Sequence, residues 1–396
     1  MIKSIYDFDF SGHKVLVRVD FNVPLDSENN VTDDNRIRES IPTIDKIIDD
    51  GGIPILMSHL GRPKGERKPK YSLKPVADYL KNKLGYSVIF AEDCVGEQAK
   101  NAVNNAKIGD IVLLENLRFH KEEELNDSEF ARKLASLGDV YVNDAFGSAH
   151  RAHASTYAVA LLFDNRLAGK LMLDEIEYLG KAITNPKKPF VAIIGGAKIS
   201  GKIDVIKNLL DKCNSILIGG GMSFTFFKAM GLEIGKSILE EDKISLASEL
   251  LQEARKKNVQ LFLPIDIIVA NQFSNDAEYK CVKQGEIPND WHGMDIGIET
   301  RNLYKNEIIK AKTIIWNGPM GVFEMEKFNK GTIAIADALV EVTAKGAITI
   351  VGGGDSAAAI NQLNYKNKIT HVSTGGGASL EFLEGKTLPG IEALSI

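Results

Sequence analysis

The hydrophobic residues of this chain gather in short, nearly continuous runs, and longer amphipathic segments lie between them. Runs rich in Val, Ile and Leu, with little polar alternation, are typical of strands buried on both faces of a parallel sheet. The runs predict eleven strands. They cover residues 14–20, 53–59, 88–92, 110–117, 140–144, 190–196, 215–220, 260–270, 313–318, 347–353 and 369–374.

The amphipathic segments predict helices between these strands. Strands that alternate with helices imply right-handed crossovers and a mostly parallel sheet, so the fold class is α/β. Eleven strands are many for one twisted open sheet. We therefore expect two Rossmann-like domains, each a mostly parallel sheet flanked by helices. The clearest helical stretches are residues 36–50, 74–84, 129–137 and 327–343.

The boundary between the two domains is expected at one long interdomain helix. Residues 167–183 have a continuous helical pattern, and TNPKKP at residues 184–189 breaks it before the next strand. A helix that joins two sheets is a stiff connector that can transmit a hinge motion, although it could instead pack on one domain only. We assign residues 1–170 to an N-terminal domain and residues 171–375, which begin with this helix, to a C-terminal domain.

Composition narrows the class of protein. The 396 residues are 44% hydrophobic and 26% charged, as in a well-packed soluble protein. The formal net charge is −5, whereas nucleic-acid-binding domains are usually basic. The cysteines Cys94, Cys213 and Cys281 form neither a disulfide framework nor a zinc-binding spacing. With Asp7 and Asp9 where a signal peptide would be apolar, and no apolar run of about 20 residues, we expect a cytoplasmic protein that binds neither nucleic acid nor membrane.

Polar and cationic residues follow the strands of the first half at the points where those strands end. In an open parallel sheet, ligands bind beyond the carboxyl ends of the strands. A single arginine after a strand is usually a solvated loop residue or an ion-pair partner, but arginines at several strand ends favour an anion site. Arginine binds carboxylate and phosphate groups bidentately, so the pattern predicts a site for a small phosphorylated acid. Its candidates are Arg18, Asp20, Asn22, Arg36, His59, Arg62, Arg118, His120, His150, Arg151 and His153.

Two of these histidines raise the question of a metal. His150 and His153 follow one strand, but no third ligand is close to them in the sequence. A zinc site needs at least three protein ligands. We therefore expect these histidines, charged or neutral, to assist anion binding instead.

Glycine-rich turns follow three strands of the second half, and each leads into a predicted helix. Residues 196–202 match the G-x-x-x-x-G-K pattern of a phosphate-binding loop, but the next residue is not the Ser or Thr that would hold Mg²⁺. Lys198 and Lys202 remain as candidate phosphate ligands. The other turns are residues 351–359 and 374–380, and backbone amides in such turns attract anions. Three junctions of this kind predict a nucleotide site.

Two acidic residues near these turns have more than one interpretation. Asp355 could cap the helix that it precedes, which is a common role for Asp, or it could hold the Mg²⁺ that accompanies nucleotide phosphates. Glu324, at the end of WNGPMGVFE, could accept hydrogen bonds from ribose hydroxyls.

Taken together, the motifs resemble the phosphoglycerate kinase family over essentially the whole chain. They are RVDFNVP, SHLGRP, LLENLRFH, NDAFGSAHRAHAS, GGAKISGKI, NGPMGVFE, GGGDSAAA and STGGGASLEFLEG, in the family's order and approximate spacing. The resemblance implies reversible transfer of the acyl phosphate of 1,3-bisphosphoglycerate to ADP, giving 3-phosphoglycerate and ATP, in glycolysis or gluconeogenesis. It also implies Mg²⁺, a monomer, hinge closure, and a C-terminal tail, about residues 376–396, that packs back on the N-terminal domain.

The resemblance assigns roles to individual residues by motif position. The glycerate substrate would be bound by Asp20, Phe21, Asn22, Arg36, His59, Leu60, Gly61, Arg62, Arg118 and Arg151. The nucleotide would be bound by Lys202, Gly293, Glu324, Gly353, Gly354, Asp355 and Ser356, with Asp355 meeting Mg²⁺. The transferred group would be surrounded by Arg36, Lys198, Lys202, Gly375 and Gly376.

For such a reaction we expect direct transfer without a covalent enzyme intermediate. The leaving group is a carboxylate, which needs no proton at neutral pH, so catalysis reduces to positioning and charge stabilisation. Arg36 opens a predicted helix and is our choice for the cation of the N-terminal side, whereas Arg38 is expected on another face.

Two other classes of protein compete with this interpretation. A hydride-transferring dinucleotide enzyme would need a G-x-G-x-x-G turn and an acidic residue about 20 positions later, and neither is clear here. A catalytically silent binding module would keep the glycine turns but would have no reason to keep the arginines as well.

Overall fold

The computed structural model describes residues 2–395, and the chain divides into two compact units. The first unit comprises the chain up to Glu177 and returns from Thr387 onward, and the second is Tyr178–Lys386. The chain passes from the first unit to the second within one helix, α6 (Lys170–Thr184). The sequence-based boundary at residue 170 lies at the start of this helix, and the tail expected from about residue 376 joins the first unit from Thr387.

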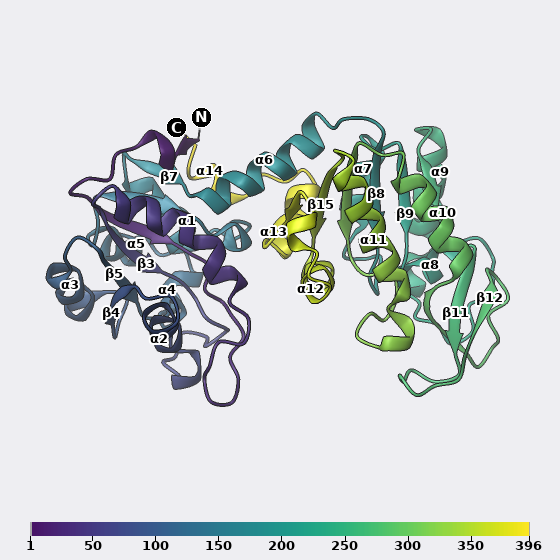
Figure 1. Ribbon diagram of the computed structural model, residues 1–396, viewed down its shortest axis with the longest axis horizontal. Helices are drawn as coiled ribbons and strands as arrows, with labels where there is room; N and C mark the ends of the chain where they lie inside the picture. Colours follow the sequence, from purple (N-terminus) through teal and green to yellow (C-terminus); the bar gives the residue numbers. More distant parts are fainter. Residues whose placement is uncertain (1, 396) are drawn as a thin grey trace. The chain divides into compact units, whose positions relative to one another are not determined.

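The first unit is built on a seven-stranded sheet in the order β1-β7-β6-β2-β3-β5-β4, and every pair of neighbouring strands is parallel. The strands are β1 (Lys3–Ser4), β2 (Lys14–Arg18), β3 (Ile53–Met57), β4 (Ser87–Ala91), β5 (Asp110–Leu114), β6 (Val140–Asn143) and β7 (Arg166–Ala168). The helices that accompany it are α1 (Asn35–Asp49), α2 (Lys74–Asn82), α3 (Gly96–Asn105), α4 (Lys121–Glu124), α5 (Ser128–Ala135) and α14 (Pro389–Glu392) (Figure 1).

The core of the first unit explains why its sequence alternates as it does. Central strands such as β2 and β3 are buried on both faces, which is why they read as continuous apolar runs. Helix α1 packs on the sheet with Ile37, Ile44 and Ile47, which recur at helical spacing and are all fully buried. Its first turn is thereby fixed beside the carboxyl end of β2.

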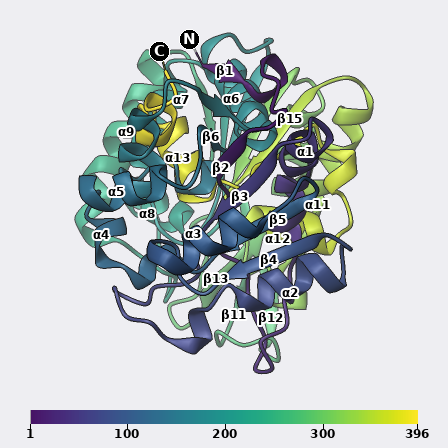
Figure 2. The ribbon, with the colours of Figure 1, turned by 90° about the vertical axis from the view of Figure 1, so that its left-hand side faces the viewer.

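The two ends of the chain meet in this first unit. Ile2 and Ser395 form an isolated antiparallel bridge, and the Nη2 of Arg166 donates to the carbonyl of Ser395 at 3.0 Å. Gly390 in α14 donates its amide to the carbonyl of Ala149 at 2.8 Å. Figures 1 and 2 show the returning segment, in yellow, beside the purple start of the chain. The segment from Thr387 is therefore an integral part of the first unit.

The second unit contains a six-stranded sheet in the order β10-β9-β8-β14-β15-β16, whose strands are all parallel to their neighbours, and a three-stranded antiparallel sheet in the order β12-β11-β13. The parallel strands are β8 (Phe190–Ile194), β9 (Ser215–Ile218), β10 (Gln260–Phe262), β14 (Thr313–Asn317), β15 (Ile348–Gly352) and β16 (His371–Val372). The antiparallel strands are β11 (Asp266–Ala270), β12 (Tyr279–Lys283) and β13 (His292–Ile296).

The helices of the second unit follow its strands as the alternation predicts. They are α7 (Ile203–Leu210), α8 (Met222–Ala229), α9 (Ile244–Lys256), α10 (Ile298–Ile308), α11 (Lys330–Ala344), α12 (Gly354–Gln362) and α13 (Gly377–Leu383). The predicted α/β class, with a mostly parallel sheet in each half of the chain, is confirmed.

Three details differ from the sequence-based prediction. Residues 260–270, predicted as one strand, form β10 and β11 in different sheets, because Pro264 interrupts the run. Strand β12 is mostly exposed and lacks an apolar run, so the antiparallel sheet gave little hydrophobic signal. Leu167 and Ala168 were predicted to begin the long helix, but they pair with the neighbouring strands as β7.

Two expectations from composition can be compared with the described residues. All three cysteines are free, as their scattered positions predict. Among residues 2–395, no helix combines the length and the apolar character that crossing a lipid bilayer requires.

Candidate functional site

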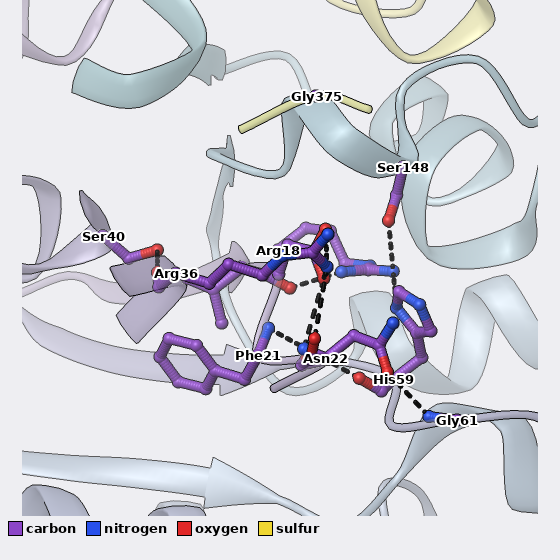
Figure 3. Close-up of polar contacts among 12 residues, drawn as sticks. Arg18, Phe21, Asn22, Arg36, Ser40, His59, Gly61, Ser148 and Gly375 are labelled. Atoms are coloured by element: carbon purple, nitrogen blue, oxygen red, sulfur yellow. Dashed lines mark hydrogen bonds and ion pairs between the residues drawn. The ribbon is translucent and has the colours of Figure 1, made fainter. Parts of the chain in front are cut away.

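The candidate anion residues of the first unit come together because their strands are neighbours. Strands β6, β2, β3 and β5 lie side by side and parallel, so their carboxyl ends open at the same edge of the sheet. Figure 3 shows several of these residues turned toward one another. We call this group the arginine rim, and its members are Arg18, Asp20, Asn22, Arg36, His59, Arg62, Arg118 and Arg151.

Arg36 reaches the rim from the second position of α1. Its Nη1 donates to both carboxylate oxygens of Asp20 at 3.1 Å and to the carbonyl of Asn22 at 3.3 Å. Its side chain is 35% exposed, and its Nη2 and Nε make no further hydrogen bond with the described residues. Arg36 is thus held at one edge while the rest of its guanidinium faces open space. Arg38, as predicted, is exposed elsewhere and pairs with Asp34 at 2.5 Å.

Asn22 and His59 are fixed by their neighbours. The Oδ1 of Asn22 accepts from the amide of Gly61 at 2.9 Å. His59 is nearly buried, and its Nδ1 lies 3.1 Å from the Nη2 of Arg18. Because a guanidinium can only donate, Nδ1 must accept, and the neutral ring carries its proton on Nε2. Burial, and then the charge of Arg18, lower the pKa of His59 well below its usual value, so this histidine is neutral at pH 7.

Arg18 stands at a strand end in the sequence but receives no role from the motifs, and it is the most deeply anchored arginine of the rim. Only 1% of its surface is exposed. Its Nε donates to the Oγ of Ser155 at 2.8 Å, and Ser155 in turn donates its Oγ to the buried carboxylate of Glu123 at 2.6 Å. The sequence did contain a sign that Arg18 is buried, because this charged residue stands within the mostly apolar run KVLVRVD.

The remaining arginines of the rim differ in burial. Arg118 is 4% exposed and donates Nη1 to the carbonyl of Gly61 at 2.9 Å. Its Nε lies 3.4 Å from Glu124, and burial lowers its pKa. Arg151 is half-buried and its Nε lies 3.1 Å from the Nε2 of His150. Arg62 is exposed and has no partner among residues 2–395.

In the second unit, the predicted phosphate ligands line one pocket of about 380 Å³. The pocket lies at the carboxyl ends of β8, β14 and β15, which are neighbours in the sheet. Backbone from the three strand ends and two lysines therefore face the same space. Its walls include Gly196, Lys198, Lys202, Asn317, Gly353, Gly354, Asp355 and Ser356.

Lys202 stands just before α7 and reaches across the pocket to Asn317. Its Nζ donates to the carbonyl of Asn317 at 3.2 Å and also contacts that residue's Oδ1. Burial lowers the pKa of Lys202 to about 8, and the charge of Asp355 opposes this shift. Lys202 is therefore mostly charged at pH 7, whereas Lys198 is exposed and has no partner among the described residues.

The turn before α12 is capped by a glycine, and Asp355 in the first turn of the helix makes no capping hydrogen bond. Gly353 is the N-cap of α12 and has a φ of 87°, a conformation that residues with a Cβ rarely adopt. Ser356 accepts from the amide of Gly318 at 2.6 Å. Asp355 lies in the first turn, makes no capping hydrogen bond and is exposed. The helix-cap interpretation of Asp355 is therefore wrong.

A second pocket of about 500 Å³ adjoins the first, because Gly196, Ala197, Pro319 and Asp355 line both. Gly293 and Glu324, assigned to nucleotide from the sequence, lie in its wall. Most of its other walls are apolar, and they include Phe224, Ile238, Pro264, Phe273 and Met320, which the sequence did not single out. Its mostly apolar walls suit an apolar ring.

The glycine at position 293 explains one wall of this second pocket. A Cβ built on Gly293 would lie 2.0 Å from the Cζ of Phe224, so only glycine lets that ring pack there. The turn Gly219–Gly221 between β9 and α8 also borders the pocket through Gly220 and Gly221. This turn is a glycine cluster at the end of a predicted strand, so the sequence could have identified it as part of the site in the same way as the other glycine turns.

Gly375 and Gly376 precede α13, which follows the edge strand β16 beside β15. Gly376 is the N-cap of this helix with a φ of 52°, and the amide of Gly375 donates to the Oγ of Ser373 at 3.1 Å. The predicted glycine-rich helix start is thus present at the same edge of the sheet as the two pockets.

Comparison with known proteins gives a consistent result. A family model described as phosphoglycerate kinase matches residues 5–386. A phosphoglycerate kinase of Chloroherpeton thalassium is 58% identical over 393 residues, which are 99% of this chain and 99% of that protein. The solved structure of phosphoglycerate kinase from Coxiella burnetii has a TM-score of 0.89 at 40% identity, covering 100% of this chain and 99% of that one. Phosphoglycerate kinase from Pyrococcus horikoshii OT3 has a TM-score of 0.87 at 32% identity, covering 99% and 98%.

Proposed function

The chain belongs to the phosphoglycerate kinase family, and from this premise we propose which of its residues perform the family's reaction. The enzyme is a phosphotransferase of glycolysis. It transfers the acyl phosphate of 1,3-bisphosphoglycerate to ADP, reversibly, and produces 3-phosphoglycerate and ATP. In the proposed arrangement each substrate has its own site, and the two sites belong to different units of the chain.

The arginine rim of the first unit binds the phosphoglycerate. One observation carries this assignment: Arg18, Arg36, Arg118 and Arg151 all lie close enough to the neutral His59 for their charges to lower its pKa, and Asp20 there is already paired with Arg36. Buried arginines such as Arg18 and Arg118 are held in place before the ligand arrives, which lowers the entropic cost of binding. The Nε2 proton of His59 adds a neutral donor. The remaining binding residues of the proposal are Asp20, Phe21, Asn22, Leu60, Gly61, Arg62 and Arg151.

The two adjoining pockets of the second unit bind ADP and ATP. The larger, apolar pocket suits the adenine ring, with Gly293 allowing Phe224 to form its wall and the exposed carboxylate of Glu324 facing the ribose. The smaller pocket suits the phosphates. There the amides from Gly353 to Ser356 stand at the start of α12, and Lys202 supplies a positive charge.

Mg²⁺ is proposed to accompany the nucleotide at Asp355. The donor chemistry fits, because Asp355 places an exposed carboxylate, which accepts no hydrogen bond from residues 2–395, beside the pocket proposed for the phosphates. Mg²⁺ commonly takes one or two protein carboxylates together with phosphate oxygens and water. When bound, the ion neutralises part of the phosphate charge.

The chemical step is proposed to be a direct transfer that needs no general base. The oxygen that gains or loses the phosphoryl group is a carboxylate oxygen, which is already ionised at neutral pH. The work of the protein is to hold the reactants and to meet the charge on the transferred group. Arg36 does so from the first unit. Lys198, Lys202 and the amides at Gly375 and Gly376 do so from the second.

The two units are proposed to close on each other during turnover. Each substrate is assigned to its own unit, and water would hydrolyse an exposed acyl phosphate, so closure both aligns the reactants and excludes water. Small-angle scattering with both substrates should show a smaller radius of gyration than the free enzyme. An unchanged radius would argue against closure.

We also propose that the enzyme acts in the cytoplasm as a monomer, which light scattering at micromolar concentration would test.

A coupled assay that follows ATP formation from ADP and 1,3-bisphosphoglycerate tests the reaction itself. A silent binding module would bind both ligands without producing ATP, and a dinucleotide enzyme would respond to neither. Isothermal titration with 3-phosphoglycerate then tests its placement. Arg118→Ala should weaken the binding of 3-phosphoglycerate and leave the binding of ADP unchanged. Lys202→Ala should weaken the binding of ADP and leave that of 3-phosphoglycerate unchanged.

A further inference from the structure

A cluster of potential metal ligands lies in the first unit, outside the arginine rim. Asp93 and Cys94 follow β4, and His120 follows the short turn after β5. These strands are parallel neighbours, so the segments after them meet. One ligand atom from each of the three residues lies within 4.8 Å of the other two. We propose that Asp93, Cys94 and His120 bind one transition-metal ion of the zinc type.

The three side chains are held together before any ion binds. The Nε2 of His120 lies 2.7 Å from the Oδ1 of Asp93, and the same oxygen accepts from the amide of Cys94 at 2.7 Å. The ring of His120 also packs against Phe130, with ring centroids 5.2 Å apart. A divalent ion would replace the contact between His120 and Asp93 and bind both side chains.

Two of the three side chains of the cluster are partly exposed to solvent. The Cys94 side chain is fully buried, whereas Asp93 and His120 are 34% and 29% exposed. An ion could therefore enter from solvent, bind the buried sulfur of Cys94 and keep a water molecule as its fourth ligand. Three protein ligands and a water are the common arrangement of zinc sites that are not fully closed.

Charge and ligand type decide which ion fits. A thiolate and a carboxylate together neutralise a divalent cation, and the imidazole adds a neutral donor. On binding, the S–H bond breaks, the sulfur–metal bond forms and the proton passes to solvent. Sulfur and imidazole ligands favour Zn²⁺ or Co²⁺ over Mg²⁺.

The cluster is distinct from the magnesium site proposed at Asp355, which is in the second unit. It is also missed by motif searches, because its ligands at positions 93, 94 and 120 match no zinc spacing. Its position gives it a consequence for the enzyme. His120 directly follows the turn Leu117–Phe119 that carries Arg118, so a bound ion would fasten this turn to the segment after β4.

The test is a titration of the full-length, nucleotide-free protein with Co²⁺, followed by absorbance. A cysteine thiolate on Co²⁺ gives an intense near-ultraviolet charge-transfer band that carboxylate and imidazole ligands do not give. We expect the band to saturate at one equivalent and to disappear when Zn²⁺ is added. Absence of the band at millimolar Co²⁺ in the wild-type protein would overturn the proposal, whatever the variants do.

Matched variants locate the site. Cys94→Ala should abolish the band and weaken binding at least tenfold, and His120→Gln should weaken it similarly while shifting the visible spectrum. Cys281→Ala removes an exposed cysteine, and His13→Gln removes a histidine that contacts Asp139 at 3.0 Å without a thiol nearby, so neither should change the titration. A band that persists in Cys94→Ala, or that is lost in Cys281→Ala, would place the ion elsewhere and refute the assignment.

Discussion

The two units of the molecule share a parallel α/β plan, but the anion sites that we propose in them use different kinds of partner. The first unit uses side chains: arginines from several strand ends, of which Arg18 and Arg118 are almost completely buried. In the second unit the proposed site is mainly backbone, where glycine turns and helix starts present amides and the partly buried Lys202 adds one charge. Side chains can be arranged around one particular small acid, whereas backbone amides suit the repeating phosphates of a nucleotide. Removing a side chain should therefore impair the first site, whereas adding a side chain at a glycine should impair the second.

The largest expected effect is the loss of Arg36. Arg36→Ala should lower kcat by about 10²-fold or more, because it removes a cation that meets charge developing in the transition state. Stopped-flow or steady-state kinetics would measure it. Arg38→Ala is the matched control, since Arg38 lies two positions away, outside the arginine rim, and pairs with Asp34. Near-wild-type kcat in Arg36→Ala would remove this residue from the mechanism.

A backbone site should respond to an added methyl group instead. Gly353→Ala places a Cβ at a φ of 87° and 3.2 Å from the side chain of Asn317, which costs about 1–2 kcal/mol and should raise the KM for ADP roughly tenfold. Gly354→Ala is its neighbour control, because nothing lies within 4 Å of that Cβ. If both variants bind ADP equally well, the turn before α12 does not hold the phosphates.

The charge of Lys202 should make nucleotide use depend on pH. Its pKa of about 8 means that the ammonium is present below pH 8 and is lost as the pH rises through that value. The kcat/KM for ADP should therefore fall by up to about tenfold between pH 7 and pH 9, since the charged fraction falls by that factor. Lys202→Arg keeps its charge and should flatten this part of the profile. A wild-type profile without a decline near pH 8 would contradict the assignment.

The smallest expected effect is at His59, where nothing should titrate. Burial and Arg18 hold its pKa well below the usual value, so its ring should stay neutral as the pH falls through the range where an ordinary histidine becomes charged. Nitrogen-15 NMR of the imidazole should report one unchanging neutral tautomer with the proton on Nε2. The same residue in denaturant, with a pKa near 6.5, is the reference. A midpoint above pH 6 in the folded enzyme would show that the rim holds a charged histidine.

Much of this site follows from the sequence through one rule. Residues after parallel strands gather at one edge of a sheet, so Asp20, His59, Arg118 and Arg151 could be grouped without coordinates. The glycine turns after β8 and β15 could be grouped for the same reason, and they line the pocket that we propose for the phosphates. Which ring nitrogen of His59 carries its proton could not be predicted. It depends on Arg18 of the neighbouring strand, whose Nη2 lies 3.1 Å from the Nδ1 of His59.

Other features were beyond the reach of hydrophobic patterns. The wall of the larger pocket depends on Phe224, whose position follows from the missing side chain of Gly293. The antiparallel sheet was missed because β12 is exposed, and an exposed edge strand needs no apolar run. Asp355 does not cap α12 because Gly353, two positions earlier, already occupies the N-cap position with a positive φ.

The return of the chain to its starting unit has a consequence for biosynthesis. A ribosome completes the whole second unit before it adds the segment from Thr387 onward. Until then Ala149 lacks its partner from Gly390, and Ser395 is not yet present to bridge Ile2. The first unit, although it is translated first, therefore cannot complete its structure until the last residues of the chain are added.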